Sequence, residues 1–320
     1  MKKIVILDGY TIHPMTEELQ WFKELGAVTI YESTPDESAA ARIGDAEIVF
    51  TDSTYIGKEV FDCCPNLEWI GILATGTNSV DLEYAKSKGI PVCNVPAYGT
   101  NAVSQCAFAL LLYACGHLKE HLEYAKNRLW CTQQTVPYWN HPSYELEGKV
   151  MGMIGFGRIG KQSAKTALAF GMKVLVFSNY PDKGLETENL KFVSKDELLA
   201  NADVLFLHCP LTEENEGLIN KESIAKMKDG VILVNTARGK LIHEFDLFEA
   251  LQSKKIAFAC LDVLAEEPPS CNNPLFTLDN CFITPHVAWT SEEARIRICQ
   301  IASENLRVFL DGQLLNCVNF

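Results

Sequence analysis

The sequence lacks two features that would place the protein in a membrane or on nucleic acid. No apolar run in its 320 residues approaches the length needed to span a bilayer. Basic residues are fewer than acidic ones, and the resulting net charge of −13 argues against nucleic acid or an anionic membrane surface as a partner. We therefore expect no nucleic-acid partner and no membrane. An anionic substrate would need a local cationic site that acts against the overall charge.

The chain also lacks an internal repeat, a low-complexity segment and a secretory signal. Its first residues resemble a signal peptide only from Ile4 to Leu7, because Asp8 and Gly9 then end the apolar run. A secretory core needs a longer apolar stretch than this. We interpret the segment as a first β-strand and expect a cytoplasmic protein.

Cysteine is plentiful, but the spacings typical of metal sites are missing. The twelve cysteines include no C-x-x-C pair, and the adjacent Cys63 and Cys64 do not resemble a zinc site. Free cysteine packs as a small hydrophobe, so we expect free thiols, no metal and a reducing compartment. Four cysteines fall within apolar candidate strands or helices: Cys106, Cys115, Cys260 and Cys299.

The most informative segment that is present is a glycine-rich turn in the middle of the chain. An apolar run, Val150–Ile154, leads into the pattern Gly155-x-Gly157-x-x-Gly160. A helical pattern and a second apolar run, Val174–Phe177, follow. Strand, glycine turn, helix and strand form the context in which this pattern indicates dinucleotide binding.

Each glycine of the pattern has a physical reason. Gly155 permits the tight turn, Gly157 lets the backbone approach a pyrophosphate, and Gly160 lets the helix pack closely on the strand. The free N–H groups at the start of the helix, with the helix dipole behind them, attract phosphate. We therefore predict a bound dinucleotide.

The first hundred residues alternate strands with helices. One helix is predicted over Thr16–Leu25, and a strongly apolar helix over 101–119 must be buried, in our interpretation between two lobes. Residues 120–149 are polar and aromatic without a clear period, which we interpret as an extended excursion that contacts a second subunit. Its aromatic residues include Trp130, Tyr138 and Trp139. The candidate strands are Lys3–Leu7, Val28–Tyr31, Ile48–Thr51, Trp69–Leu73 and Pro91–Asn94.

The central region supplies six further candidate strands separated mostly by helical segments. Such alternation indicates a parallel sheet covered on both faces, and six strands match the doubly wound dinucleotide fold. A final amphipathic helix, Ser291–Leu310, is expected to return to the first lobe. The candidate strands are Val150–Ile154, Lys173–Phe177, Val204–His208, Val231–Asn235, Ala257–Leu261 and Cys281–Thr284.

A chain of this length is expected to form two lobes. The sequence therefore predicts an α/β fold with two Rossmann-like, doubly wound parallel-sheet domains and a cleft between them. Residues 1–99 with 287–320 would form a substrate-binding lid domain. Residues 100–286 would form the dinucleotide-binding domain.

Reactive side chains follow several strands of the central region. In a doubly wound fold, ligands bind beyond the carboxyl ends of the strands. His208 follows the third of these strands, Arg238 the fourth, Glu267 the fifth and His286 the sixth. An arginine, a glutamate and a histidine on one sheet edge, beside a nicotinamide site, suggest hydride transfer to a carbonyl.

These motifs, in this order, resemble the D-isomer-specific 2-hydroxyacid dehydrogenase family over the whole chain. Two segments, Asn94–Val103 and His286–Thr290, resemble its glycerate dehydrogenase or hydroxypyruvate reductase branch. The motifs that carry the family resemblance are the glycine turn, Asn-Thr-Ala-Arg-Gly at 235–239, Asp-Val-x-x-x-Glu-Pro at 262–268, Pro-His at 285–286 and the loop Ala74–Asp81.

The resemblance implies a role for each candidate. Arg238 would hold the substrate carboxylate and keto oxygen, since its planar fork suits bidentate contact. His286 would donate a proton to the ketone oxygen, and Glu267 would fix its ring and favour its protonated form. The backbone amides near Thr75 and Gly76 would bind the carboxylate.

Cofactor contacts follow from the same resemblance, with NAD or NADP as the cofactor. Relatives that use NAD usually carry an acid at the end of the second strand, where this chain has Ser178 and Asn179. No acid follows until Asp182, but the arginine typical of NADP users is also missing, so the choice is open with a lean to NADP. The implied contacts are Thr100, Gly155, Gly157, Arg158, Ile159, Gly160, Ser178, Asn179, His208, Cys209, Pro210, Thr236, Ala237 and Asp262, the last of these to the nicotinamide amide.

Each candidate also has a structural interpretation. Arg238 could cap a turn or pair with a surface acid, Glu267 could be a solvated loop charge, and His286 could be a structural histidine. For His208, lining the cofactor and packing in the core are equally favoured. Trp289 could pack in the core, although we favour a role in narrowing the substrate pocket. The remaining histidines are interpreted as structural or surface residues: His13, His117, His121, His141 and His243.

The sequence thus predicts a dimeric enzyme that reduces a small 2-keto acid, preferably hydroxypyruvate or glyoxylate, to the D-hydroxy acid. One rival is a dehydrogenase for phosphite, formate or a larger 2-keto acid on the same scaffold. The other is a nucleotide-sensing protein of the corepressor type, which would bind the cofactor without turnover.

Overall fold

The computed structural model describes residues 1–12, 17–134, 136–137 and 141–320. The chain forms two compact units, of which unit 1 comprises Met1–Tyr98 with Thr290–Phe320 and unit 2 comprises Gly99–Trp289. Four residues named in the sequence predictions lie outside the described residues: His13, Thr16 at the start of a predicted helix, Tyr138 and Trp139.

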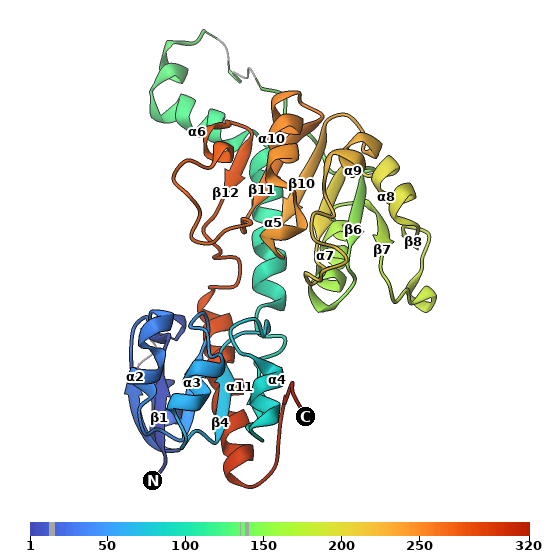
Figure 1. Cartoon of the computed structure of the whole chain (residues 1–320). Helices are drawn as coiled ribbons and strands as arrows, with labels where there is room; N and C mark the ends of the chain where they lie inside the picture. The colour runs from blue at the N-terminus through green and yellow to red at the C-terminus, as the bar shows by residue number, and fades with distance from the viewer. Residues whose placement is uncertain (13–16, 135, 138–140) are drawn as a thin grey trace. The chain divides into compact units, whose positions relative to one another are not determined.

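Unit 1 is built on a five-stranded parallel sheet with the order β2-β1-β3-β4-β5 (Figure 1). This is one of the two common doubly wound orders. The strands β3 and β4 are buried along their whole length, as expected for a parallel sheet covered on both faces. The strands are β1 (Lys3–Ile6), β2 (Ala27–Ile30), β3 (Ile48–Thr51), β4 (Trp69–Ile72) and β5 (Val92–Cys93).

Helices cover both faces of this sheet. On one face, α2 (Ala39–Ile43), α3 (Lys58–Cys63) and α4 (Leu82–Ser87) join a common apolar core with the strands. On the other face, α1 (Leu19–Lys23) and the last helix, α11 (Glu292–Leu310), pack together, and α11 also packs on β4. The ring of Phe309 stacks on Trp69 there. The final helix therefore belongs to unit 1.

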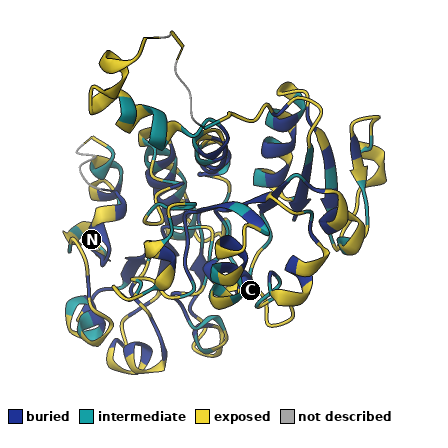
Figure 2. Ribbon diagram, turned by 90° about the horizontal axis from the view of Figure 1, so that it is seen from above, coloured by how far each residue is buried: buried dark blue, intermediate teal, exposed yellow. Residues whose placement is uncertain are grey.

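Unit 2 contains a seven-stranded parallel sheet with the order β12-β11-β10-β9-β6-β7-β8 (Figure 1). Read from β8, this is the nucleotide-binding order 3-2-1-4-5-6 with one strand added at its end. Two apolar cores flank the sheet, and Figure 2 shows buried residues on the strands with exposed residues on the outer turns. The strands are β6 (Val150–Ile154), β7 (Lys173–Phe177), β8 (Leu190–Phe192), β9 (Val204–Leu207), β10 (Val231–Asn235), β11 (Ile256–Leu261) and β12 (Cys281–Ile283).

The predicted fold class is confirmed, and every predicted strand agrees with the structure to within one residue at each end. The edge strand β8 was missed, so the prediction of six strands in this sheet was wrong. β8 has only three residues and pairs with β7 alone, and its middle residue, Lys191, is exposed. Three residues are too few to show an alternating pattern.

The helices of unit 2 cover the two faces separately. On one face lie α5 (Thr100–Cys115) and α7 (Arg158–Ala169), which pack against each other. The other face is covered by α8 (Lys195–Asn201), α9 (Lys221–Lys226) and α10 (Glu244–Gln252).

Two predictions near residue 117 require correction. The apolar helix predicted to reach residue 119 ends at Cys115, because His117 adopts a left-handed backbone with φ of 46°. The segment 120–149, predicted to be an extended excursion because it shows no clear period, contains most of helix α6 (Leu118–Lys126) and a 3₁₀ turn (Leu129–Thr132). Helix α6 buries none of its residues, and its leucines Leu118 and Leu122 are exposed.

Helices α5 and α6 meet at an angle of 66°. Among the described residues, no single helix is long and apolar enough to span a membrane. Only α5 and α6 taken together, as this bent pair, reach the length and composition of a span.

Candidate functional site

The glycine turn of unit 2 connects β6 to helix α7. Gly155 has a φ of 95°, and a Cβ there would lie 2.6 Å from the backbone of His208 and Cys209. A Cβ on Gly160 would lie 2.5 Å from the carbonyl oxygen of Gly155. The turn packs so tightly on the neighbouring loop after β9 and on the start of α7 that neither position can hold a side chain. Gly157, the N-cap residue of α7, would find no atom within 4 Å of an added Cβ.

This turn fits a dinucleotide cofactor. Open space beside Gly157 leaves room for phosphate at the start of α7, whose first N–H groups have no partner within the helix. Arg158 and Ile159 occupy the first turn of the helix. On the loop after β10, the buried hydroxyl of Thr236 has no hydrogen-bond partner within the described residues. A buried hydroxyl without a partner is what a bound ligand would satisfy.

The end of β7 carries the residues expected to face the ribose. Ser178 is partly buried and accepts a hydrogen bond from the backbone N–H of Tyr180 at 3.2 Å through its hydroxyl. Asn179 is exposed. No carboxylate occupies this strand end, and the nearest one, Asp182, caps the following 3₁₀ turn by accepting from Gly184 N.

His208, at the end of β9, is tied to the helices of the same unit. Its Nε2 lies 2.9 Å from the hydroxyl of Ser163 on α7, which in turn donates to the hydroxyl of Ser104 on α5 at 3.0 Å. Burial lowers the pKa of His208 to about 4, so the ring is neutral near pH 7. The structure gives His208 a packing role; its contact with a cofactor, like those of the adjacent Cys209 and Pro210, stays a prediction.

The loop after β10 presents Arg238. Asn235, which is fully buried, shapes this loop by accepting from Ala237 N at 3.0 Å and donating to Arg238 O at 2.9 Å. The guanidinium donates to the carbonyl oxygen of Ala237 at 2.7 Å. A Cβ on Gly239 would lie only 1.8 Å from Leu264 O, so the glycine is required for the Arg238 loop to reach the loop after β11.

The loop after β11 holds the loop after β12 through Asp262. This residue is 1% exposed, and its carboxylate accepts from Thr284 Oγ1 at 2.5 Å, Val287 N at 2.9 Å and Ala288 N at 2.8 Å. Its backbone carbonyl accepts from His286 N at 2.8 Å. Both carboxylate oxygens are thus engaged inside unit 2, and the predicted contact of Asp262 with the nicotinamide amide stays a prediction.

His286 and Glu267 form a hydrogen-bonded pair. His286 Nδ1 lies 2.6 Å from Glu267 Oε2, and Glu267 Oε1 accepts from Leu264 N at 2.9 Å. The His286 side chain is 43% exposed, so the ring is accessible while its carboxylate partner is held by the backbone. With Nδ1 engaged, Nε2 is the nitrogen through which the ring can pass a proton to a ligand.

Electrostatics favour the charged form of both partners. The hydrogen bond to Glu267 raises the pKa of His286 above 6.5, against an opposing effect of burial. Burial alone would raise the pKa of Glu267, but the hydrogen bond and the charge of His286 outweigh it, and the pKa lies below 4.5. Arg238 acts on both groups, which places the three side chains in one electrostatic cluster.

The cluster lies on one edge of one sheet. Strands β10, β11 and β12 are neighbours, and Arg238, Glu267 and His286 follow their carboxyl ends. This arrangement offers a fixed cation for an anionic oxygen and a histidine whose protonation is supported by a carboxylate. Such a cluster can bind a small acid and exchange one proton with it.

His286 sits in a conformation that few residues adopt. Its φ of 54° lies in the left-handed region, where non-glycine residues are uncommon. Its N–H donates to Asp262 O and also lies 3.0 Å from Thr284 O, so the surrounding hydrogen bonds hold this conformation. Backbone strain of this kind concentrates at functional sites.

The predicted substrate residues Thr75 and Gly76 lie in unit 1, on the loop after β4. The Thr75 hydroxyl donates to Val95 O at 2.9 Å, and Asn94 Nδ2 donates to Thr75 O at 2.8 Å. Asn94 was not among the predicted site residues. The sequence indicates it only through its position directly after β5, the strand that pairs with β4, which the Thr75 loop follows.

Trp289 and Thr100 lie at the two ends of the unit 2 segment. The Cβ of Trp289 lies 3.5 Å from where a Cβ on Gly99 would be, so the tryptophan packs near the start of α5. Thr100 is the first residue of α5. Whether Trp289 narrows a substrate pocket and Thr100 contacts a cofactor stays a prediction.

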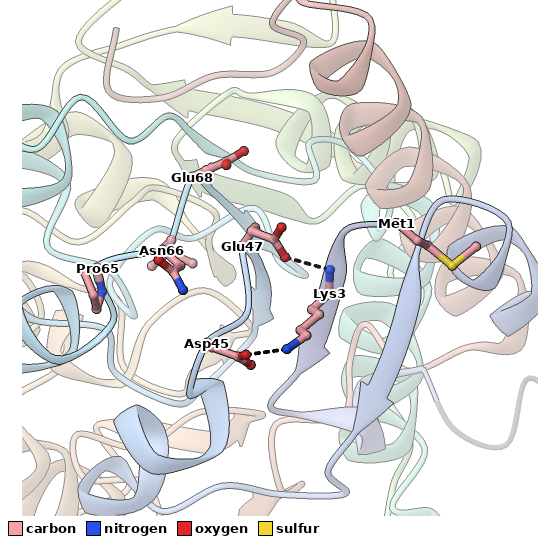
Figure 3. Close-up of a pocket in the computed structure, with 8 residues that line it drawn as sticks. Met1, Lys3, Asp45, Glu47, Pro65, Asn66 and Glu68 are labelled. Atoms are coloured by element: carbon pink, nitrogen blue, oxygen red, sulfur yellow. Dashed lines mark hydrogen bonds and ion pairs between the residues drawn. The ribbon is translucent and has the colours of Figure 1, made fainter.

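A separate hollow of about 530 Å³ in unit 1 lies at the amino ends of the strands (Figure 3). Its lining residues lie before or at the start of β1, β3 and β4, whereas ligands of doubly wound sheets bind beyond the carboxyl ends of the strands. Glu47 accepts from Lys3 N at 2.8 Å, and Glu68 pairs with Lys2 at 2.6 Å. We assign no site to this hollow. Within the described part of the chain, no group of three or more histidine, cysteine or acidic residues could hold a metal ion.

The chain is similar to known proteins over most of its length. The family model described as the NAD-binding domain of D-isomer-specific 2-hydroxyacid dehydrogenases matches residues 108–288. The chain is 48% identical over 320 residues to a hydroxypyruvate reductase of Blautia hydrogenotrophica, with 99% of each chain covered. It is 35% identical over 320 residues to a glycerate dehydrogenase of Methylorubrum extorquens, again with 99% of each covered.

A solved structure extends the likeness to the fold. The TT0316 protein of Thermus thermophilus is 33% identical, superimposes with a TM-score of 0.87, and 99% of each chain is covered.

The histidine–carboxylate pair predicts a measurable titration. The His286 ring should titrate above pH 6.5 in the wild-type protein, and Glu267→Gln should lower its pKa because the charge that favours the imidazolium is lost. Histidine ring signals followed by NMR against pH report this directly. The ring signals of His243, whose Nδ1 lies 3.0 Å from Asp246 in the same unit, serve as the control and should be unaffected by the Glu267→Gln substitution.

The pKa shifts of His286 and Glu267 determine the direction in which pH changes the stability of the folded protein. The raised pKa of His286 contributes stability that is fully present below about pH 6.5 and is lost as the pH rises through the raised value. The lowered pKa of Glu267 contributes stability that is present above about pH 4.5 and is lost on acidification. An unchanged His286 titration in Glu267→Gln would contradict the pairing.

Proposed function

The chain belongs to the D-isomer-specific 2-hydroxyacid dehydrogenase family, and we propose that it reduces a small 2-keto acid to the D-2-hydroxy acid with a nicotinamide cofactor. Hydroxypyruvate or glyoxylate is the preferred substrate in this proposal. The observation that carries it is the pairing of His286 with Glu267 at 2.6 Å, with Arg238 in the same electrostatic cluster.

The chain's own residues would handle charge and protons. Arg238 would bind the substrate carboxylate and keto oxygen through its fork of N–H donors. His286 would donate its Nε2 proton to the ketone oxygen, and Glu267 would stabilise the imidazolium before that transfer. When bound, a reduced nicotinamide supplies the hydride. The reverse reaction requires neutral His286, which accepts the proton from the hydroxyl group.

The two units would divide the binding work. Unit 2 carries the glycine turn and the acid–base cluster, which supports its assignment as the dinucleotide-binding domain. Unit 1 carries Thr75 and Gly76, whose backbone amides we assign to the substrate carboxylate. The sequence boundaries proposed for these domains are 1–99 with 287–320 and 100–286.

A small substrate is supported by two observations. The relative that is 48% identical is named a hydroxypyruvate reductase. Trp289, which packs at the start of α5, follows the proposed proton donor His286 by three positions in the chain. A bulky side chain at this place would leave room for a short keto acid.

For the cofactor, we propose a preference for NADP over NAD. A carboxylate at the end of β7 would repel a 2′-phosphate, and this chain has Ser178 and Asn179 there instead. The Ser178 hydroxyl and the Asn179 amide can both donate hydrogen bonds to phosphate oxygens.

The reaction is tested by following cofactor oxidation optically with hydroxypyruvate, glyoxylate, pyruvate and phenylpyruvate. We expect turnover with the first two, and a loss of about 10² to 10⁴ in kcat for His286→Ala with little change in cofactor affinity. His243→Ala is the matched control, because it removes a second histidine–carboxylate pair of the same unit, His243 with Asp246, that shares no residue with the Arg238, Glu267 and His286 cluster.

Three outcomes of that assay count against the proposal. Activity confined to phenylpyruvate would exclude a small pocket beside Trp289. Tight cofactor binding without turnover on any keto acid would favour a nucleotide-sensing protein. Equal losses of turnover and cofactor affinity in His286→Ala would assign the histidine a structural role.

Cofactor preference is tested separately. We expect a higher kcat/KM with NADPH than with NADH, and Ser178→Asp should reverse the order, since a carboxylate binds the ribose diol and repels a 2′-phosphate. Each close charge contact is worth about 1 to 3 kcal/mol, so the ratio should move by about tenfold or more. A strong NADH preference of the wild-type protein would refute the proposed choice.

We further propose a homodimer that uses the segment after α5. Leu122, Leu129, Trp130 and Tyr144 all expose large apolar surface there, from 46% to 62% of each residue. Isolated exposed apolar residues are ordinary, but several on one segment mark an interaction surface.

Sedimentation or light scattering should give twice the chain mass of 35.6 kDa. Leu122→Glu together with Trp130→Glu should shift the protein toward monomer, because charges are costly at a buried interface. The double variant Glu213→Gln and Glu214→Gln, at exposed positions elsewhere in unit 2, serves as control. A wild-type monomer at micromolar concentration would refute the dimer.

A further inference from the structure

The end of the chain runs antiparallel to strand β5 in unit 1. Asn94 N donates to Asn316 O at 3.1 Å, and Val318 N donates to Val92 O at 2.9 Å. Between these two bonds, Cys93 and Cys317 face each other as a bridge pair. From the sequence, the cysteines were interpreted as free thiols that pack as small hydrophobes.

The hydrogen-bond pattern defines the kind of pair that the two cysteines form. The bonds join the residues on either side of Cys93 and Cys317, so the cysteines themselves form a non-hydrogen-bonded antiparallel pair. In such pairs the Cα atoms lie about 4.5 Å apart and the side chains are close. Disulfides span Cα separations of roughly 4.4 to 6.8 Å, so this register places the two sulfurs within bonding reach.

Side chains of the tail fix this register. Asn319 Oδ1 accepts from Val92 N at 2.8 Å, and its Nδ2 donates to Ile90 O at 2.9 Å. Asn316 Nδ2 donates to Asn305 Oδ1 at 2.8 Å, and Asn305 Nδ2 donates to Asn94 O at 2.8 Å. The tail is therefore bound on both sides of Cys317, which holds its thiol beside Cys93.

The two thiols differ in access. Cys93 is 1% exposed, and burial together with the neighbouring Cys317 raises its pKa to about 12. Cys317 is only half-buried, and its thiol donates to Asn319 Oδ1 at 3.4 Å. The indole N–H of Trp69, which has no conventional hydrogen-bond partner in the described structure, also acts on the Cys93 sulfur.

We propose that Cys93 and Cys317 are a redox modification site that forms a reversible disulfide with a small disulfide oxidant such as glutathione disulfide. The thiolate of Cys317 attacks one oxidant sulfur, breaks its S–S bond and releases one thiol. The Cys93 thiol then loses its proton and attacks the mixed disulfide, releasing the second thiol. The two cysteines lose two electrons and two protons, and one oxidant disulfide becomes two thiols.

The bond would link the two separate chain segments of unit 1. Its loop encloses the whole of unit 2, and cross-links that close long loops restrict the unfolded chain most. The cross-link would also fix the backbone next to Asn94, whose side chain holds the Thr75 carbonyl. The modification itself is independent of the proposed reaction, because none of its atoms belongs to the Arg238, Glu267 and His286 cluster.

The experiment uses the full chain with the three exposed cysteines removed. In the background Cys63→Ser, Cys131→Ser, Cys271→Ser, the protein is incubated with glutathione disulfide, alkylated, digested and mapped by mass spectrometry. We expect a cross-linked peptide pair that contains Cys93 and Cys317, released by dithiothreitol. The melting temperature should rise by about 3 °C or more on oxidation and return on reduction.

Single substitutions separate the two steps. With Cys93→Ser, Cys317 should retain a glutathione adduct that cannot resolve, and with Cys317→Ser the buried Cys93 should stay unmodified. Circular dichroism confirms that each variant is folded, and Cys317→Ser, at a half-buried position, keeps the test available if Cys93→Ser does not fold. Recovery of both cysteines as free thiols, or of a glutathione adduct on Cys317 in the presence of Cys93, would overturn the proposal.

Discussion

The arrangement of the candidate site depends on the buried carboxylate of Asp262. A carboxylate removed from water is costly unless hydrogen-bond donors replace the lost hydration. Here Thr284, Val287 and Ala288 supply those donors, and all of them come from the segment that carries His286. The requirement to satisfy one buried charge thereby fixes the loop after β12 against the end of β11. These bonds add to the backbone bonds of His286 N to Asp262 O and Thr284 O, which hold the left-handed conformation of His286.

Much of this arrangement could be predicted from the sequence. Long apolar strands and the glycine turn indicated the parallel sheets, and the order of strands placed Arg238, Glu267 and His286 on one edge. The pairing of Glu267 with His286 was expected from family resemblance and is present in the structure. These features could be found because each depends on local pattern or on the general topology of parallel sheets.

Other features depend on contacts that no local pattern reveals. The carboxylate of Asp262 holds the loop after β12 through backbone donors that cannot be recognised from residue types, and its predicted cofactor contact stays a prediction. The break at His117 depends on a positive φ that histidine adopts only where the surroundings impose it. The register that brings Cys317 to Cys93 depends on a tail that returns to the sheet after the whole of unit 2, so the pairing is invisible in the sequence.

The separation of tasks along the unit 2 sheet has a physical consequence. The acid–base cluster follows β10, β11 and β12, whereas the glycine turn and Ser178 follow β6 and β7, with β9 between the two groups. Each group is held by its own contacts. Hydrogen bonds of Asp262 and Asn235 shape the loops of the acid–base cluster, and the close contacts of Gly155 and Gly160 shape the glycine turn. Because residues without shared partners contribute nearly independently to free energy, a substitution at the end of β7 should leave the His286 pair undisturbed. His208, directly after β9, packs with the glycine-turn side of the sheet, since its ring bonds to Ser163 and its backbone lies against Gly155.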